Sequence, residues 1–368
     1  MPEQLPTAAA VVVIGAGQAG LAVAYHLRRR GLTPGDDLLV LDANPGAGGA
    51  WRHRWPGLTL GGTHRLHDLP GMTDTGLTFT EADPHRPARE LVAEYYGAYE
   101  DHHDLRVVRP ARVTAVRRDG DGYLVECAPG SPVTAVRARV VVSATGTWNR
   151  PRLPLVEGRE EFSGLQITTA DYTDPAPFVG LRVAVVGGGT SALTFLDEVG
   201  DVAQDLHWYT RRVPLFHDEE EELTAERGRI AVGIQDEAAR AGRPLPSIVA
   251  VTGLPRSPLV RRLEGKDRLR REPMFASLDA TGAVTADGEH VELDAIIWAT
   301  GFRPDLTHLQ PLGVVNEVGG IVVEDGRVPD EPGLFLAGYG PQASTISSNR
   351  AARVTALTIA RLLAGPQA

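Results

Sequence analysis

Cysteine is almost absent from this chain of 368 residues, in which Cys127 is the only one. A single cysteine excludes an intramolecular disulfide, a cysteine-rich zinc site and a redox-active dithiol pair. Lysine is just as scarce: Lys266 is the only one, and arginine carries nearly all of the positive charge. With a formal net charge of −10 at pH 7, the chain lacks the basic excess with which proteins bind nucleic acid or an anionic membrane surface.

Long apolar runs are missing as well. The apolar stretch Val11–Ile14 ends at once in glycine, and no run approaches the length that spans a bilayer. The first ten residues have neither the basic start nor the apolar core of a signal peptide, so we expect a cytoplasmic protein. The length is sufficient for two domains that each bury a core of their own.

Glycine is plentiful instead, and it follows two apolar stretches in the same pattern. The β-branched residues Val11–Ile14 predict a strand that is buried on both faces. The glycine turn and the Ala- and Leu-rich segment after it predict a helix whose N-terminus accepts the diphosphate of a dinucleotide. Asp42 ends the next predicted strand, where an acidic side chain binds ribose hydroxyls. The residues predicted to hold this dinucleotide are Gly15, Gly17, Gln18, Ala19, Gly20 and Asp42.

A second unit of the same kind begins at residue 181. Its strand, glycine turn and helix are followed by a strand, residues 205–209, that leads into two arginines instead of an acid. Arginine suits the 2′-phosphate of NADP, so we expect this site to prefer NADP over NAD. The residues predicted to bind it are Gly187, Gly189, Thr190, Ser191, Ala192, Arg211 and Arg212.

An Ala-Thr-Gly triplet closes two further apolar stretches, residues 140–146 and 295–301. One precedes the second dinucleotide unit and the other follows it, as expected when a domain is inserted and the chain then re-enters the first sheet. We therefore predict a first domain of residues 1–165 and 295–368 and a second domain of residues 166–294.

Other segments complete the prediction. Residues 113–127 alternate as an antiparallel hairpin does, and a second short hairpin is predicted at residues 283–293. Residues 230–269 are predicted to be helical. The last helix is predicted over residues 350–363, with Ser347, Ser348 and Asn349 as candidate caps.

Two glycine-rich loops before residue 70 carry candidate functional side chains. Trp51 follows the glycine cluster of residues 46–50 and is a candidate wall for a cofactor. His64, His67 and Asp68 lie in the next loop and are candidate catalytic residues that contact the substrate. Acidic and cysteine partners at ligand spacing are lacking around these histidines, so we predict no metal.

Together these motifs make the sequence similar to the two-dinucleotide-binding-domain flavoproteins, and within them to the flavin-containing monooxygenases. The resemblance covers nearly the whole chain and rests on residues 15–20, 48–51, 145–154, 187–192 and 299–304. It implies an α/β fold with two Rossmann-like dinucleotide-binding domains and a small antiparallel β insert, with FAD at the first site and NADPH at the second. The further cofactor-binding residues that it implies are Gly49, Trp51, Thr145, Gly146, Thr300, Gly301, Gly338, Ser347 and Ser348.

The resemblance also implies a reaction. NADPH reduces the flavin, oxygen adds at its C4a atom, and the peroxyflavin transfers one oxygen atom to nitrogen, sulfur or a carbonyl group of a small organic substrate. The partners are then that substrate and molecular oxygen, and a homodimer is one alternative for the assembly. The N-terminus of the last helix is expected to point at the flavin pyrimidine.

Two positions depart from the family pattern. Residues 162–172 keep the family's linker fingerprint but have Thr168 where a histidine belongs. The loop that places an asparagine beside the flavin in many members offers Gly61, Gly62 and Thr63 here, so amine oxygenation does not follow directly. Two other classes stay open: an NADPH-dependent flavin reductase that passes electrons to a quinone or redox partner, and a non-catalytic flavin-binding protein.

Overall fold

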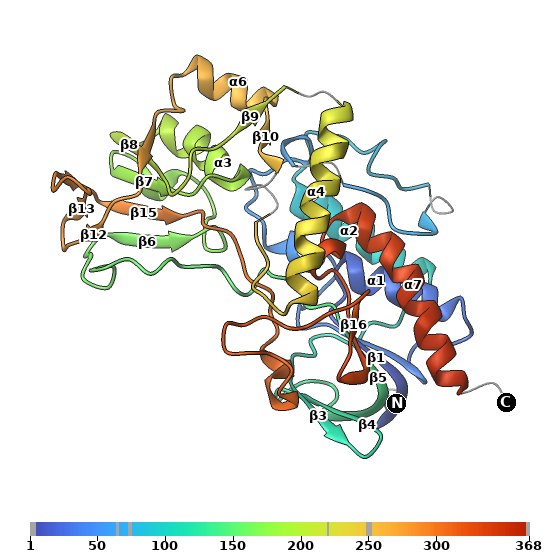
Figure 1. Cartoon of the computed structure of the whole chain (residues 1–368). Coiled ribbons are helices and arrows are strands. Elements are labelled where there is room, and N and C mark those ends of the chain that lie inside the picture. The colour runs from blue at the N-terminus through green and yellow to red at the C-terminus, as the bar shows by residue number, and fades with distance from the viewer. Residues whose placement is uncertain (1–4, 64–65, 73–75, 219–220, 248–251, 366–368) are drawn as a thin grey trace.

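Two mainly parallel β-sheets organise the structure, a computed structural model that describes residues 5–63, 66–72, 76–218, 221–247 and 252–365 (Figure 1). The first sheet has the strand order β16-β17-β5-β1-β2, and an antiparallel hairpin, β3 and β4, extends from β5. Val11 of β1 lies opposite Leu38 of β2 and Val140 of β5, both in parallel register. The strands are β1 (Ala8–Ile14), β2 (Leu38–Leu41), β3 (Val113–Asp119), β4 (Gly122–Cys127), β5 (Ala135–Ser143), β16 (Arg327–Val328) and β17 (Glu331–Leu336).

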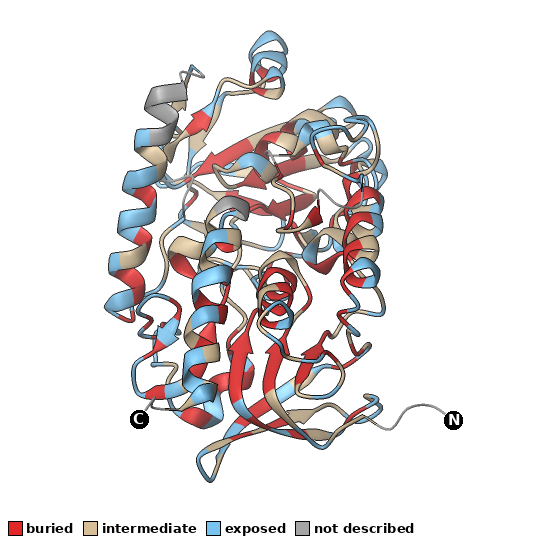
Figure 2. Ribbon diagram, turned by 90° about the vertical axis from the view of Figure 1, so that its right-hand side faces the viewer, coloured by how far each residue is buried: buried red, intermediate tan, exposed pale blue. Residues whose placement is uncertain are grey.

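The first sheet is buried on both faces, as the run of β-branched residues predicts (Figure 2). Val11 and Val13 point to a core shared with three helices, α1 (Gln18–Arg28), α2 (Ala88–His102) and α7 (Thr345–Ala364). Val12 and Ile14 point to the opposite core, which the β3–β4 hairpin and a short 3-10 helix, η6 (Thr307–Leu312), complete.

The second sheet has the order β11-β8-β7-β15-β6, with all neighbours parallel. One of its faces packs against two helices, α3 (Thr190–Glu198) and α6 (Pro258–Gly265). The other face packs against a small antiparallel sheet that contains the second predicted hairpin. The strands are β6 (Leu165–Thr168), β7 (Arg182–Val186), β8 (Asp205–Thr210), β11 (Arg271–Pro273), β12 (Ser277–Leu278), β13 (Gly282–Val284), β14 (His290–Glu292) and β15 (Ala295–Trp298).

The position of β15 differs from the sequence-based expectation. Residues 295–298 were predicted to return to the first sheet, but they pair with β7 on one side and β6 on the other. The chain therefore re-enters the first sheet only after residue 298. The physical reason is that the two domains are built alike. Each strand that leads into a glycine turn pairs in parallel with a strand that ends in Ala-Thr-Gly: β1 pairs with β5, and β7 pairs with β15.

The helical expectation for residues 230–269 is only partly correct. Helix α4 (Glu221–Arg240) ends at Arg240, and β10 (Leu254–Pro255) then pairs with β9 (Phe216–His217) before α6 begins. In Figure 1, α4 runs from the side of the second sheet down to the first domain, where Ala239 joins the core. Of the helices that the structure describes, none is long and apolar enough to cross a membrane.

Helix α7 begins five residues earlier than predicted. Ser344 is its cap, because the Ser344 Oγ accepts a hydrogen bond from the Ser347 backbone N–H at 3.1 Å. Ser347, Ser348 and Asn349, the predicted caps, instead lie within the first two turns of the helix. The sequence contains several serines here, and only the local backbone shows which one is non-helical.

Candidate active site

The first glycine turn packs backbone against backbone. Gly15 has a φ of +102°, and a Cβ there would lie 2.5 Å from the carbonyl oxygen of Ala144. A Cβ on Gly20 would overlap the carbonyl oxygen of Gly15 in the same way. Around the Cβ position of Gly17, by contrast, no described residue outside the local backbone has an atom within 4 Å, so the N-terminus of α1 is open there. This open space at a helix N-terminus is a cradle that fits the diphosphate of FAD.

Asp42 is bound into the same turn. Its Oδ2 accepts a hydrogen bond from the Ala16 N–H at 2.9 Å, and its Oδ1 accepts one from the Asn44 N–H at 2.7 Å. The carboxylate is almost fully buried and lies 3.6 Å from an Nη of Arg109. Arg109 in turn forms a bidentate pair with Glu100, whose pKa is raised by burial. The carboxylate is thus fixed at the end of β2, where the prediction places the ribose.

Arg109 was not among the predicted site residues. It follows the segment that bridges to Leu41 of β2, and no motif distinguishes it from the many other arginines of the chain. The only signal in the sequence is its distance of nine residues from Glu100, which is not a recognisable pattern.

The loop that carries Trp51 lies directly on the glycine turn. A Cβ on Gly49 would be 2.8 Å from the Cα of Gly17, so the two backbones are in contact. Trp51 packs against the core of the first domain and also against the core of the second. The Trp51 side chain therefore lies at the junction of the two domains. That it forms a wall of the FAD site stays a prediction.

The last strand and the last helix close the first site. Gly338 has a φ of +71°, and a Cβ there would lie 2.9 Å from the side chain of Ala19 in α1. Ser348 is buried in the second turn of α7, and its Oγ has no hydrogen-bond partner among the described residues. An unsatisfied hydroxyl near a helix N-terminus fits a polar, electron-accepting edge such as the flavin pyrimidine.

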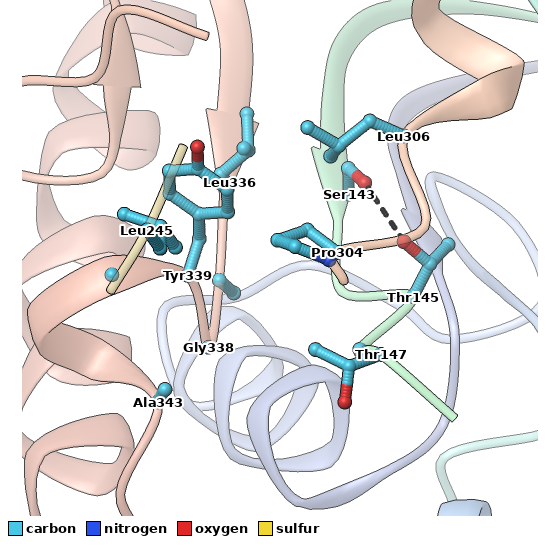
Figure 3. A pocket seen from close by; sticks show the side chains of 13 residues that line it. Ser143, Thr145, Thr147, Leu245, Pro304, Leu306, Leu336, Gly338, Tyr339 and Ala343 are labelled. Carbon is cyan, nitrogen blue, oxygen red and sulfur yellow. Dashed lines mark hydrogen bonds between the residues drawn. The ribbon is translucent and has the colours of Figure 1, made fainter. Parts of the chain in front are cut away.

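A pocket lies at the carboxyl ends of β5 and β17, beside this site (Figure 3). Thr145 and Pro304 line one side, and Tyr339 and Leu245 line the other. Three predicted cofactor residues, Thr145, Gly146 and Gly338, are therefore brought together here. The carboxyl ends of parallel strands are the edge at which such folds bind their ligands.

A buried hydrogen-bond chain supports this pocket. The Ser143 Oγ lies 3.0 Å from His308 Nε2 and 3.4 Å from the Thr145 Oγ1, and Thr145 donates to the Asp305 carbonyl oxygen at 2.6 Å. Burial lowers the pKa of His308 to about 4, so its imidazole is neutral at pH 7. Thr145 thus ties the end of β5 to the segment that re-enters the first domain.

The predicted catalytic loop is only partly described. His64 lies outside the described residues. His67 contributes its carbonyl oxygen, which accepts a hydrogen bond from Gln18 Nε2 at 3.3 Å. The Asp68 carboxylate accepts the Phe79 N–H at 2.8 Å, while the Asp68 carbonyl oxygen accepts from Asn349 at 2.7 Å. The loop is therefore hydrogen-bonded to α1 and α7, and the Asp68 carboxylate is bound to a backbone N–H of the loop. A catalytic role for these residues stays a prediction.

The structure offers no metal site in the part of the chain that it describes, where no three His, Cys, Asp or Glu side chains converge.

The second glycine turn repeats the first. A Cβ on Gly187, whose φ is +144°, would overlap the carbonyl oxygen of Ala299. Around the Cβ position of Gly189, no described residue outside the local backbone has an atom within 4 Å. Gly189 also caps α3, so this helix N-terminus is open as well. The geometry fits a second dinucleotide. Of the remaining predicted residues, Thr190, Ser191 and Ala192 form the first turn of α3.

Arg211 and Arg212 follow β8 on the surface. Both are exposed, and neither guanidinium forms an ion pair with any of the described residues. In the second interdomain connection, the segment that follows β15, Thr300 donates its hydroxyl to the Arg152 carbonyl oxygen, and the Gly301 carbonyl oxygen accepts the Arg152 N–H at 2.8 Å. Gly301 has a φ of +81°. These two residues therefore join the connections to each other in the structure.

The two domains are held together through Glu198 at the end of α3. Trp55 of the first domain donates its Nε1–H to Glu198 Oε1 at 3.1 Å, and Tyr172 donates its hydroxyl to Oε2 at 2.8 Å. The Trp55 ring meets Tyr172 edge-on at 5.6 Å and lies 5.6 Å from Phe195. Burial raises the pKa of the Tyr172 hydroxyl, so it remains a donor.

Thr168, which replaces the fingerprint histidine, is buried at the end of β6. Its hydroxyl donates to Asp171 at 2.6 Å, and the same carboxylate accepts the Thr168 N–H at 2.9 Å. Thr168 thus closes the turn that leads to Tyr172 without an imidazole.

Comparison with known proteins agrees with this geometry. The family model described as pyridine nucleotide-disulphide oxidoreductase matches residues 12–230. The solved structure of a flavin-containing monooxygenase from Stenotrophomonas maltophilia is 34% identical and superposes with a TM-score of 0.79, covering 96% of this chain and 98% of that one. The chain belongs to the flavin-containing monooxygenases.

Other relatives are similar over different shares of their length. A Baeyer-Villiger monooxygenase from Streptomyces coelicolor is 31% identical over 54% of this chain and 37% of its own length. An uncharacterized CzcO-like oxidoreductase from Geobacillus kaustophilus is 23% identical over 89% of this chain and 90% of its own length. As a flavin-containing monooxygenase, the protein is an NADPH-dependent FAD oxidoreductase, and both predicted cofactors are confirmed at the level of the family.

Proposed function

We propose that this flavin-containing monooxygenase transfers one oxygen atom from O2 to a small organic substrate in a single-component reaction that consumes NADPH. The observation that carries the proposal is the position of Trp51. This side chain packs against the cores of both domains, in a loop whose backbone touches the first glycine turn. The two dinucleotide sites therefore share one junction.

Each part of the chain has a role in this proposal. The open helix N-termini at Gly17 and Gly189 bind the two diphosphates, and Asp42 binds the ribose of FAD. Arg211 and Arg212 bind the 2′-phosphate of NADPH, since arginine forms strong paired hydrogen bonds with phosphate. The buried Ser348 hydroxyl orients the flavin pyrimidine.

The exclusion of water rests on the domain contact. Bound FAD supplies the oxygen-activating chemistry, and monooxygenation needs a site from which bulk water is kept out. Trp55 and Tyr172 seal the contact around Glu198, and Trp51 covers the junction from the first domain. These aromatic side chains are the ones expected to keep the reacting atoms dry.

The reacting atom of the substrate is proposed to be sulfur or a carbonyl carbon rather than an amine nitrogen. The loop that holds an asparagine in many members contributes here the Thr63 hydroxyl, which donates to the Leu60 carbonyl oxygen at 2.7 Å. Gly61 packs against Pro84 of the neighbouring segment. A side-chain amide that could contact the flavin is therefore missing from residues 61–63.

The test is a balance of products in the presence of a sulfide. The FAD-loaded protein is supplied with NADPH, oxygen and methyl phenyl sulfide, and the sulfoxide and hydrogen peroxide are both quantified per NADPH consumed. We expect sulfoxide to account for most of the NADPH and peroxide for little of it. If all consumed oxygen is recovered as peroxide, and a quinone is reduced under argon instead, the protein is a reductase and the proposal is wrong.

A further inference from the structure

Arg54 is a half-buried cation that forms no ion pair with any carboxylate of the described residues. Its guanidinium carbon lies 4.3 Å from the ring centroid of Trp148 and 5.4 Å from that of Trp51. Its Nε is buried and has no hydrogen-bond partner in the described part of the chain. Burial lowers its pKa to about 10, so the group remains charged at neutral pH.

The neighbouring arginines contrast with Arg54. In the same loop, Arg52 donates to the Ala47 carbonyl oxygen at 2.6 Å. Behind the glycine turn, Arg109 pairs with Glu100. The buried Nε of Arg54 is therefore a donor that lacks an acceptor among the described residues, which is costly, and an anion bound beside it would supply one.

The surroundings of Arg54 place it at the crossing of both interdomain connections. Trp148 belongs to the first connection, the segment between β5 and β6, and its ring stacks on Phe302 of the second connection, the segment after β15, at 5.0 Å between centroids. Pro151 and Phe302 form a backbone bridge at the same point. Because Trp51 lies in the loop on the first glycine turn, the guanidinium stands where that loop meets both connections.

The phosphates of both cofactors have other binding groups. The diphosphates fit the open N-termini at Gly17 and Gly189, and the 2′-phosphate fits Arg211 and Arg212. Arg54 is therefore left for a third ligand. Two tryptophan rings beside a planar guanidinium suit a molecule that combines an apolar body with a carboxylate, which the guanidinium binds through two parallel hydrogen bonds.

We propose that Arg54 binds the carboxylate of an anionic substrate and makes the enzyme selective for small apolar carboxylic acids, with Trp51 and Trp148 packing against the apolar part. This inference rests on the proposed monooxygenase function for its kinetic test, although the binding of the acid itself does not depend on oxygen transfer.

The kinetic test uses two sulfides that differ only in charge, methyl phenyl sulfide and 4-(methylsulfanyl)benzoate. We expect the native enzyme to have the higher kcat/KM for the acid. In Arg54→Gln, the ratio of kcat/KM between acid and neutral sulfide falls by about tenfold or more, as expected for a lost charged hydrogen bond. Arg52→Gln, the matched control from the same loop, keeps the native ratio. An unchanged ratio in Arg54→Gln overturns the proposal.

Binding is tested without turnover. Benzoate is titrated into the oxidised, FAD-loaded protein, and the quenching of tryptophan fluorescence is followed. We expect binding to the native protein and to Arg52→Gln, weaker binding to Arg54→Lys, and the weakest binding to Arg54→Gln. If benzoate binding depends on Arg54 while no sulfide is oxygenated, the monooxygenase proposal fails and the anion site stands.

Other outcomes contradict the anion site itself. If Arg54→Gln loses FAD, or raises the KM for NADPH while benzoate affinity is unchanged, the guanidinium belongs to a cofactor and the proposal is wrong. If Arg54→Gln does not fold, the native enzyme still tests the anion site. A native enzyme that does not bind benzoate overturns the proposal without any variant.

Discussion

Gly15 and Ala144 are in direct backbone contact, since a Cβ on Gly15 would lie 2.5 Å from the Ala144 carbonyl oxygen. Gly15→Ala is therefore expected to push β1 away from the end of β5 and to destabilise the protein even without FAD. Gly17→Ala, with open space around its Cβ position, is expected to leave the stability of the FAD-free protein unchanged. Its methyl group instead occupies the diphosphate position, and FAD affinity falls about tenfold or more.

Thermal unfolding of the FAD-free proteins and FAD titration by fluorescence separate these effects. Gly189→Ala is the matched control, because it fills the equivalent open space at the second site. Gly189→Ala should lower the affinity for NADPH and leave the affinity for FAD unchanged. Equal loss of FAD affinity in Gly17→Ala and Gly189→Ala would contradict the assignment of the two sites.

Arg211 is expected to decide between the two nicotinamide nucleotides. It is exposed after β8 and free of ion pairs with the described residues, so its guanidinium is available to a 2′-phosphate. Arg211→Ala should raise the KM for NADPH about tenfold or more, and should leave the KM for NADH unchanged. Anaerobic flavin reduction measures both, with the exposed Arg270→Ala as control. Equal native rates with NADH and NADPH would disprove the phosphate assignment.

Glu198 accepts hydrogen bonds from both domains. Glu198→Ala leaves the Trp55 Nε1–H and the Tyr172 hydroxyl without their acceptor, which should lower the free energy of unfolding by about 1–3 kcal/mol. Glu198→Gln keeps one acceptor oxygen and should lose less. Urea unfolding measures the difference. We also expect faster peroxide release from NADPH-reduced Glu198→Ala, because the domain contact then admits water; unchanged peroxide release would show that this contact does not seal the site.

His308 gives the protein a defined sensitivity to acid. Its folded-state pKa, about 4, is below the ordinary value of 6.5 because of burial, which outweighs the raising effect of Asp305. The unfolded chain therefore binds a proton that the folded chain refuses, and stability falls as the pH drops from about 6.5 towards 4. The loss amounts to roughly 3 kcal/mol.

His308→Gln should remove this contribution while keeping a polar partner for Ser143. Urea unfolding at pH 7, 6 and 5 of both proteins measures it as a difference in slope. His26, whose pKa is also lowered to about 4, contributes equally to both and cancels in the comparison. Parallel pH profiles would contradict this, because they would mean that folding does not lower the pKa of His308.

The two glycine turns could be predicted from sequence because each is local. Strand, turn and helix follow one another within about twenty residues, and the φ angles of Gly15 and Gly187 explain why glycine stands there. The buried pairing of Arg109 with Asp42 and Glu100 could not be predicted from the sequence, because it joins three segments that share no sequence pattern.

The sheet to which β15 belongs could not be predicted from the sequence either. Both Ala-Thr-Gly stretches have the same composition, and only the pairing with Val183–Val186 assigns the second one to its sheet. The identity of the α7 cap was a third case, because Ser344, Ser347 and Ser348 are chemically equivalent and differ only in backbone conformation.

The loop of residues 49–58 belongs to the first domain by sequence, but Trp55 and Leu58 lie in the core of the second. Its backbone rests on Gly17 at one end, and its indole is bound to Glu198 of α3 at the other. A ligand that shifts the loop at the Gly17 end must also shift the hydrogen bond between Trp55 and Glu198 at the other end. Such coupling is reciprocal, so whatever factor FAD adds to the affinity for NADPH, NADPH adds to the affinity for FAD.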